Sequence, residues 1–132
     1  MRSVALVLAL LLTASPITGG AVEWVPTWMV VVASAYDPCE KCCGRFADGL
    51  TYKETNAWKA GVAVDPAVIP LGSRLDIPGY KRGSNKNGSW ILADDIGGGI
   101  RGKHIDVRFK THSEALQWGR KEIKVRVWRR TR

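Results

Sequence analysis

The chain has 132 residues, with 20 Lys or Arg against 12 Asp or Glu, and its formal net charge is +8. This length leaves room for one domain and rules out a multi-domain enzyme, and a composition of 45% hydrophobic and 24% charged residues disfavours global disorder and a coiled coil. A basic surface favours an anionic partner, which could be nucleic acid, anionic lipid or an anionic cell-wall polymer.

The first residues predict an export signal. Arg2 is followed by an uninterrupted apolar run over residues 4–12 and then by the small residues 19–21. This is the pattern of a secretory signal, and the run is shorter than the roughly 17–25 residues that span a bilayer. We expect residues 1–21 to be a signal peptide cleaved after Ala21, with an uncleaved interfacial anchor as the alternative. Export places the protein outside the cytoplasm, secreted, periplasmic or in the cell envelope, with no stable membrane span after signal removal.

The rest of the chain predicts a small barrel. We expect a linker over residues 22–30 and one domain over residues 31–132. Short runs rich in β-branched residues, closed by Gly, Pro, Asn or Asp, are typical of strands. About six such strands and many turns favour an all-β fold closed into a barrel. The expected strands are residues 29–35, 61–64, 74–77, 90–93, 104–109 and 123–127, and the expected loops are residues 37–60 and 81–89.

One brief helix is expected near the C-terminus. Thr111 and Glu114 have the spacing of a capping box, in which each side chain binds the other residue's free backbone N–H. Gly119 is a natural end for this helix.

Three cysteines, Cys39, Cys42 and Cys43, form a C-x-x-C-C cluster. In an exported chain a disulfide could join Cys39 to Cys42 or Cys43 and leave one free thiol. A zinc site is a weaker alternative, because four ligands are needed and the histidines, His104 and His112, lie far away in the sequence. A redox-active C-x-x-C is weaker still, since no βαβ unit follows it. We therefore expect no metal and no cofactor.

Three aspartates are placed where strands are expected to end or to run. Asp65 and Asp95 close strands, and Asp106 lies inside one. A buried carboxylate is costly unless it is paired, and an apolar pocket raises its pKa, which suits a general acid. Gly97 and Gly98, after Asp95, let a backbone approach a ligand closely. The alternative is that these aspartates cap turns or face solvent.

The stretches 61–72 (GVAVDPAVIPLG), 95–106 (DIGGGIRGKHID) and 114–119 (EALQWG) resemble the 3D domain, named for three aspartates. That domain occurs in lytic transglycosylases of the membrane-bound A type and in stationary-phase-survival-type proteins of Gram-positive bacteria. Residues 35–51 look like the cysteine-bearing versions, and the resemblance spans about residues 33–128.

The resemblance implies a six-stranded double-psi β-barrel. It also implies cleavage of the β-1,4 bond between N-acetylmuramic acid and N-acetylglucosamine, leaving a 1,6-anhydro end. By position, Asp106 matches the family's catalytic acid, Asp95 the aspartate that supports it, and Asp65 the third. Thr51 falls where the family has a threonine that lines the substrate groove.

One carboxyl group suffices for this reaction, because the 6-hydroxyl of the sugar replaces water. Asp106 would act as acid and then as base, whereas an ordinary glycosidase needs two carboxyls. Tyr36 and Trp58 are expected to stack on sugar rings, and Trp90 and Trp118 to pack in the core.

The partner expected from these features is the peptidoglycan glycan strand. The main alternative is a non-catalytic, expansin-like barrel that binds the cell wall, and the next is a metal or redox protein that depends on its cysteines. A nucleic-acid binder conflicts with export and lacks a recognised motif. The larger transglycosylases complete the groove with a second domain, so a barrel this small could form a homodimer.

Overall fold

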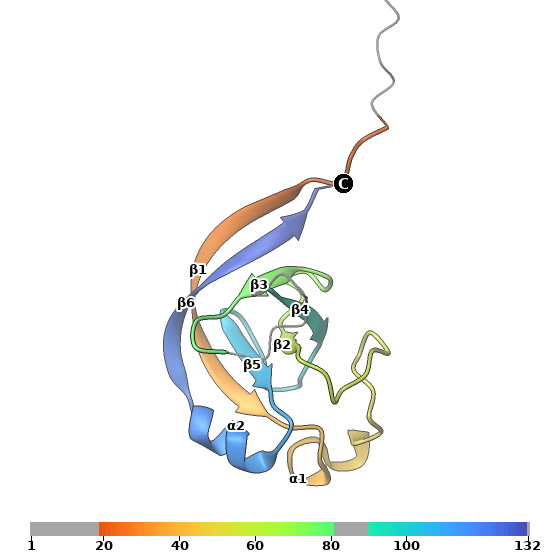
Figure 1. The fold of residues 1–132 in the computed structure, drawn as a ribbon, viewed down its shortest axis with the longest axis vertical. Helices are drawn as coiled ribbons and strands as arrows, with labels where there is room; N and C mark the ends of the chain where they lie inside the picture. The colour runs from red at the N-terminus through yellow and green to blue at the C-terminus, as the bar shows by residue number, and fades with distance from the viewer. Residues whose placement is uncertain (1–18, 81–89, 132) are drawn as a thin grey trace, which may run out of the picture.

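The computed structural model describes residues 19–80 and 90–131 (Figure 1). Most of the expected signal peptide and the expected loop 81–89 lie outside the described residues. Six strands and two short α-helices are assigned. They are β1 (Trp24–Tyr36), α1 (Glu40–Cys43), the 3-10 turn η1 (Gly44–Phe46), β2 (Val62–Val64), β3 (Arg74–Asp76), β4 (Trp90–Asp95), β5 (His104–Arg108), α2 (His112–Trp118) and β6 (Lys121–Arg130).

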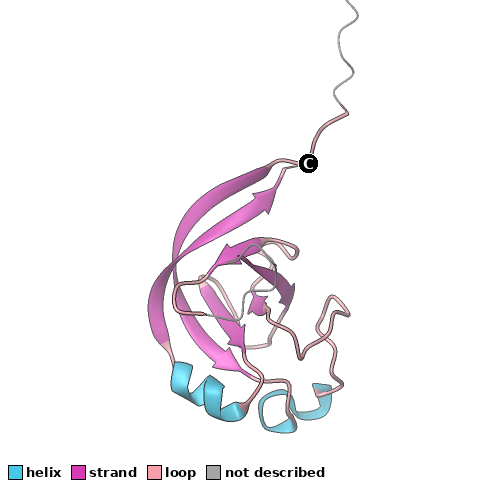
Figure 2. Cartoon of the chain, in the orientation of Figure 1, coloured by secondary structure: helices cyan, strands magenta, loops and turns pink. Residues whose placement is uncertain are grey.

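The six strands close into a barrel in the order β1-β5-β2-β4-β3-β6. Two neighbouring pairs, β1 with β5 and β2 with β4, are parallel, and the other pairs are antiparallel. Both helices lie at the same end of this barrel (Figure 2). The all-β, six-stranded barrel predicted from the sequence is thereby confirmed.

The core fills the barrel with alternate residues of each strand, as the period of two in a strand requires. Val31 and Ala33 of β1 and Val125 and Val127 of β6 are buried, while their neighbours in sequence are more exposed. The other strands add Val62, Val64, Leu75, Ile91, Ala93, Ile105 and Val107.

The expected linker over residues 22–30 is wrong for most of its length. β1 already begins at Trp24 and pairs with β6 from Trp24 opposite Arg130 to Ala33 opposite Lys121. Among residues 19–80 and 90–131, this first half of β1 pairs with β6 alone, because pairing with β5 starts only at Val32. Such an edge position tolerates Pro26. Its side chains are mostly exposed, so no apolar alternation marked it as a strand.

The helix α2 has the predicted capping box, with Thr111 Oγ1 accepting from Glu114 N at 3.2 Å and Glu114 Oε2 accepting from Thr111 N at 3.2 Å. Trp118 at its end packs against the core and contacts the rings of Tyr80 and Phe109. The expected loop over residues 37–60 contains the additional short turns α1 and η1.

Trp90, in contrast, is not a core residue. It is only partly buried and lines a surface groove with Trp24 and Trp128, where the guanidinium carbon of Arg74 lies 4.3 Å from its ring centroid. The cause is the β1–β6 ribbon, which brings two further indoles and arginines to this face. Among the described residues no helix has the length and apolar character needed to cross a membrane.

Candidate functional site

A cavity of about 640 Å³ opens beside α1. Both helices lie at this end of the barrel (Figure 1). Its walls come from the ends of β1 and β4, from Asp106 within β5, from α1 and from the loop between α1 and β2. Parallel pairing of β1 with β5 and of β2 with β4 explains why residues distant in sequence meet here. Six of the predicted site residues line this cavity together: Tyr36, Thr51, Asp95, Gly97, Gly98 and Asp106.

Asp106 projects from β5 beside Ser34, its register partner on β1. Ser34 Oγ lies 2.9 Å from Asp106 Oδ1 and 2.8 Å from Nε2 of His104. Burial raises the pKa of Asp106 to about 6; the hydrogen bond from Ser34 opposes this shift, and the charge of Asp95 adds to it. A carboxyl group with this pKa exchanges its proton readily near neutral pH, as a general acid and base must.

Asp95 ends β4 and is held by three donors. Its Oδ2 accepts from the Tyr36 hydroxyl at 2.7 Å, and its Oδ1 accepts from the backbone N–H groups of Tyr52 at 2.9 Å and Ile96 at 3.0 Å. These bonds fix the carboxylate in the cavity wall. Asp95 therefore supplies a positioned negative charge near Asp106.

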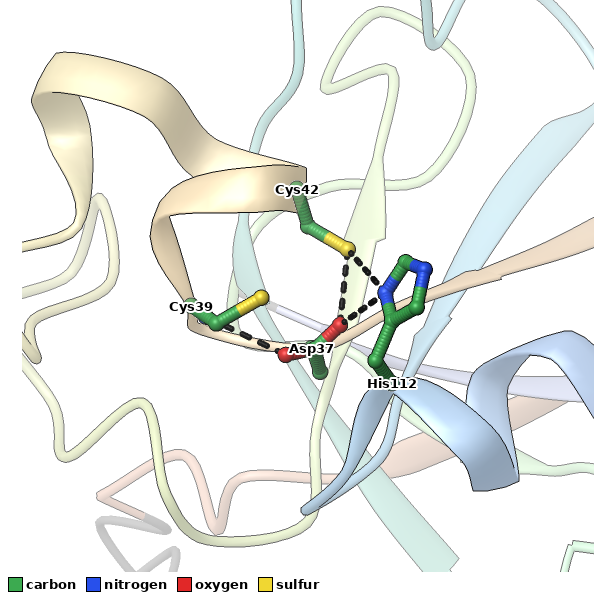
Figure 3. Close-up of side chains that lie close together, drawn as sticks. All are labelled: Asp37, Cys39, Cys42 and His112. Carbon is green, nitrogen blue, oxygen red and sulfur yellow. Dashed lines mark hydrogen bonds and ion pairs between the residues drawn. The ribbon is translucent and has the colours of Figure 1, made fainter.

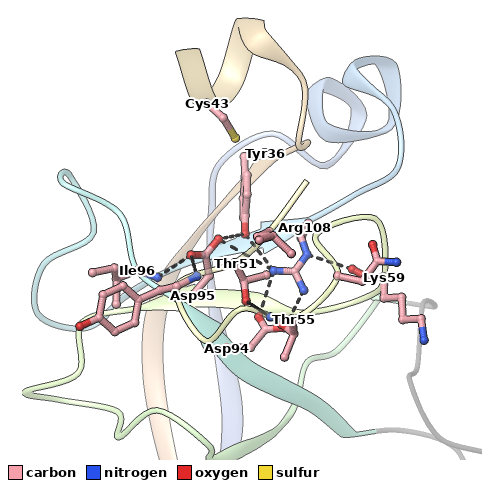
Figure 4. A network of polar contacts seen from close by, with 12 residues as sticks. Tyr36, Cys43, Thr51, Thr55, Lys59, Asp94, Asp95, Ile96 and Arg108 are labelled. Atoms are coloured by element: carbon pink, nitrogen blue, oxygen red, sulfur yellow. Dashed lines mark hydrogen bonds and ion pairs between the residues drawn. The ribbon is translucent and has the colours of Figure 1, made fainter. Parts of the chain in front are cut away.

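Arg108 and Asp94 form a buried ion pair behind the cavity, which sequence analysis did not assign to the site (Figure 4). Arg108 Nη1 lies 2.9 Å from Asp94 Oδ1, and Nη2 lies 2.8 Å from Asp94 Oδ2. The same Nη1 donates to the Tyr36 hydroxyl at 3.1 Å. A continuous polar chain thus runs from Asp94 through Arg108 and Tyr36 to Asp95.

Electrostatics keeps Arg108 charged and Tyr36 neutral in this chain. Burial opposes the charge of Arg108, but its bonds to Asp94 and the neighbouring charges outweigh burial and raise the pKa of its guanidinium. Burial also raises the pKa of Tyr36, which remains a neutral donor to Asp95. The sequence feature that points to this ion pair is Arg108, a charged residue among apolar neighbours in a strand. A charged side chain is buried only when a group of opposite charge pairs with it.

Asp65 lies outside the cavity wall. Its carboxylate accepts from Ala67 N at 3.0 Å and from Gly102 N at 2.8 Å, and these two hydrogen bonds lower its pKa. It joins the turn after β2 to the turn before β5. Trp58 also lies outside the wall and is 49% exposed. It stands next to the wall residue Gly49, since a Cβ added to Gly49 would lie 3.6 Å from Trp58 Nε1.

Cys42 and Cys43 line the cavity, and all three cysteines are free thiols. Burial raises the pKa of Cys43, while burial and a hydrogen bond to Asp37 raise that of Cys42 to about 12. The net shift of both pKa values is upward, so the surroundings of Cys42 and Cys43 do not favour a reactive thiolate. His112, which sequence distance seemed to separate from the cluster, has its Nδ1 only 3.5 Å from Cys42 Sγ.

The chain is similar to several known proteins. A cell wall-binding protein, YocH, of Bacillus subtilis strain 168 is 42% identical over 100 residues, which are 75% of this chain and 32% of that protein. YabE of the same organism, named for cell-wall shaping, is 38% identical over 100 residues, covering 75% of this chain and 22% of that protein. The chain thus spans less than half the length of these relatives.

Among solved structures, the lytic transglycosylase MltA of Escherichia coli aligns with a TM-score of 0.46 and 22% identity over 63% of this chain and 28% of that one. A second structure of MltA aligns with a TM-score of 0.44 and 24% identity over 62% of this chain. Residues 60–129, more than half of the chain, match the family model described as the 3D domain. The protein belongs to the 3D domain family.

Proposed function

We propose that the protein acts on the bacterial cell wall as a peptidoglycan lytic transglycosylase, with Asp106 as the single general acid and base. The observation that carries this proposal is the half-buried Asp106 in the cavity wall, with its pKa raised to about 6 beside the fixed carboxylate of Asp95. Membership of the 3D domain family and the names of two relatives, for cell-wall shaping and binding, support a cell-wall substrate. They also support a place in the cell envelope or outside the cell.

In the proposed reaction, protonated Asp106 gives its proton to the glycosidic oxygen between N-acetylmuramic acid and N-acetylglucosamine as the C1–O bond breaks. The 6-hydroxyl of the muramic acid residue attacks C1 and closes the 1,6-anhydro ring. That hydroxyl returns its proton to the Asp106 carboxylate, so the enzyme is regenerated. No water is consumed, and no second carboxyl is needed to activate one, in contrast to a hydrolytic glycosidase.

The remaining cavity residues have supporting roles in this proposal. The charge of Asp95 raises the pKa of Asp106 and so keeps the acid protonated closer to neutral pH. Tyr36 and the buried Thr51 shape the wall, and Gly97 and Gly98 leave room for a sugar ring beside the backbone. Asp65 acts away from the cavity, as a structural hydrogen-bond acceptor. Trp58, exposed beside Gly49, is placed to stack on a sugar at the rim.

A second candidate function is binding to the wall without cleavage. The relative YocH, named as a cell wall-binding protein, favours it. In that case the same cavity would hold a glycan strand, and Asp106 would be a hydrogen-bonding group rather than a proton donor.

The test is mass spectrometry of the soluble fragments released when the purified protein is incubated with peptidoglycan. Wild-type protein should release anhydro-muropeptides, and Asp106→Asn should release none. Glu122→Gln, an identical chemical change on the exposed side of β6, is the matched control and should behave as wild type. Release by Asp106→Asn at the wild-type rate would remove the catalytic assignment. Co-sedimentation with the wall but no fragments from the wild type would favour the binding function.

A further inference from the structure

Four side chains, one carboxylate, two thiols and one imidazole, converge where β1 ends and both helices begin. Asp37 follows β1, Cys39 is the N-cap of α1, Cys42 lies within α1, and His112 is the first residue of α2. One carboxylate oxygen, two sulfurs and one imidazole nitrogen all lie within 4.8 Å of one another. Figure 3 shows the two sulfurs, the ring and the carboxylate gathered around one point.

The local backbone explains why these groups face one another. The backbone N–H groups of Cys42 and Cys43 both donate to Cys39 O, at 3.1 and 2.9 Å, and this turn puts the sulfurs of Cys39 and Cys42 on one side. The capping box of α2 begins at Thr111 and places His112 against the end of β1. Asp37 is held between them and is only 2% exposed.

The distances between these potential ligand atoms are close to those between neighbouring ligands of a tetrahedral zinc ion. With Zn–S of about 2.3 Å and Zn–N or Zn–O of about 2.0–2.1 Å, neighbouring ligand atoms lie about 3.3–3.8 Å apart. Cys42 Sγ and His112 Nδ1 are already 3.5 Å apart. Asp37 Oδ1 lies 3.0 Å from His112 Nδ1 and 2.7 Å from Cys42 Sγ, which are hydrogen-bond distances. These two contacts need to lengthen by less than about 1 Å to become ligand edges.

A Cys-His-Asp catalytic triad is the competing interpretation, and the geometry opposes it. In a triad the histidine contacts the nucleophile through one ring nitrogen and the carboxylate through the other. Here both Cys42 Sγ and Asp37 Oδ1 contact the same nitrogen, Nδ1 of His112. A metal ion bound by all three side chains would draw the sulfur and the carboxylate oxygen toward the same ring nitrogen, as is seen here.

We propose that Asp37, Cys39, Cys42 and His112 bind one zinc ion in a closed, structural site. Two thiolates and an imidazole select zinc over calcium or magnesium, which prefer oxygen ligands. Four protein ligands complete a tetrahedron and leave no open position for substrate, so the ion has a structural role. The pair Cys39 and Cys42 has the C-x-x-C spacing of structural zinc sites.

The ion would tie together the end of β1, α1 and the start of α2. Cys42 of this cluster and its neighbours Pro38 and Cys43 also form part of the wall of the 640 Å³ cavity. Zinc binding would therefore hold the α1 side of the cavity in place against β1 and α2. This proposal is independent of which reaction, if any, takes place in the cavity.

The experiment measures metal content. Protein is purified in reductant, incubated with zinc sulfate, desalted and weighed by native mass spectrometry, with zinc quantified by atomic spectrometry. Wild type should carry one zinc ion per chain, and Cys39→Ser and His112→Ala should each lose it. Cys43→Ser removes a neighbouring thiol outside the four-ligand set and should retain it.

Two further measurements keep the test valid if a variant folds poorly. Cobalt(II) bound to the wild type should give the intense visible bands of a tetrahedral ion and sulfur-to-cobalt charge transfer in the near ultraviolet. Chelation should lower the Tm of the wild type and of Cys43→Ser, and added zinc should restore it. Zinc-free wild type after reduction, full zinc in His112→Ala, or loss of zinc from Cys43→Ser would each overturn the proposal.

Discussion

The carboxyl group of Asp106 is held half-buried on β5, in a site that favours its neutral form. Burial and the charge of Asp95 raise its pKa, and only the Ser34 hydroxyl opposes them. The environment that makes Asp106 a suitable acid therefore also makes its ionisation unfavourable for the folded state. Functional residues often carry such a cost.

Asp106→Asn is therefore expected to stabilise the folded protein at neutral pH. The folded-state pKa of about 6 lies above the ordinary value of 3.8, so ionisation weakens the fold as pH rises between these values. The gain in free energy of unfolding should reach at most about 3 kcal/mol above this range and vanish below it. Denaturant unfolding of both proteins at acidic and neutral pH measures this difference. An equal gain at both pH values would show that ionisation of Asp106 is not its source.

At the scale of elements, short strands are joined by one buried ion pair. Strands β2 and β3 have three residues each, too few to be stable alone. Arg108 at the end of β5 binds Asp94 of β4 and, through Nε, the carbonyl of Lys59 before β2 at 2.9 Å. Breaking such a pair leaves an uncompensated buried charge, which costs about 3–5 kcal/mol. The pair therefore couples β2, β4 and β5 at the end where the cavity opens.

Gly61 provides the space for this ion pair, and Gly61→Ala is expected to lower the free energy of unfolding by about 1–3 kcal/mol. A Cβ at Gly61 would lie 1.9 Å from Arg108 Nη2 and 2.7 Å from Asp94 Oδ1, so the guanidinium has to move. Gly99→Ala is the matched control, since a Cβ there meets nothing within 4 Å. Chemical denaturation measures both. Equal stability of the two variants would contradict the packing argument.

At the scale of the whole molecule, cations and indoles gather on the outer face of the β1–β6 ribbon. Trp28 is 56% exposed, with Lys124 Nζ 5.1 Å and Arg126 Cζ 5.0 Å from its ring centroid. Arg74 Cζ lies 4.0 Å from the ring centroid of Trp24. With the formal net charge of +8, this face is suited to attract anionic polymers.

Binding to anionic cell walls is accordingly expected to weaken as salt concentration rises, because exposed charges are screened. Co-sedimentation with purified walls over a series of salt concentrations measures the effect. The double variant Lys124→Gln with Arg130→Gln should bind more weakly and show a shallower salt dependence. Binding that is independent of salt in the wild type would show that shape and stacking, rather than charge, hold the protein on the wall.

Local patterns in the sequence predicted six strand segments and the helix α2, though not the first half of β1. Alternation of apolar residues placed Val125 and Val127 inward, and the spacing of Thr111 and Glu114 predicted the capping box of α2. These features depend on residues that are close together in the sequence, so the sequence alone reveals them. The motif around Asp106 likewise indicated the family before any contact was known.

Only the tertiary structure decided which distant groups meet. The length of β1 depends on its pairing with β6, and the parallel pairing of β1 with β5 puts Ser34 against Asp106. The pairing of Arg108 with Asp94, and the position of His112 beside the cysteines, also arise from closure of the barrel. Register and closure are set by packing of the whole core, so no local pattern in the sequence specifies these contacts.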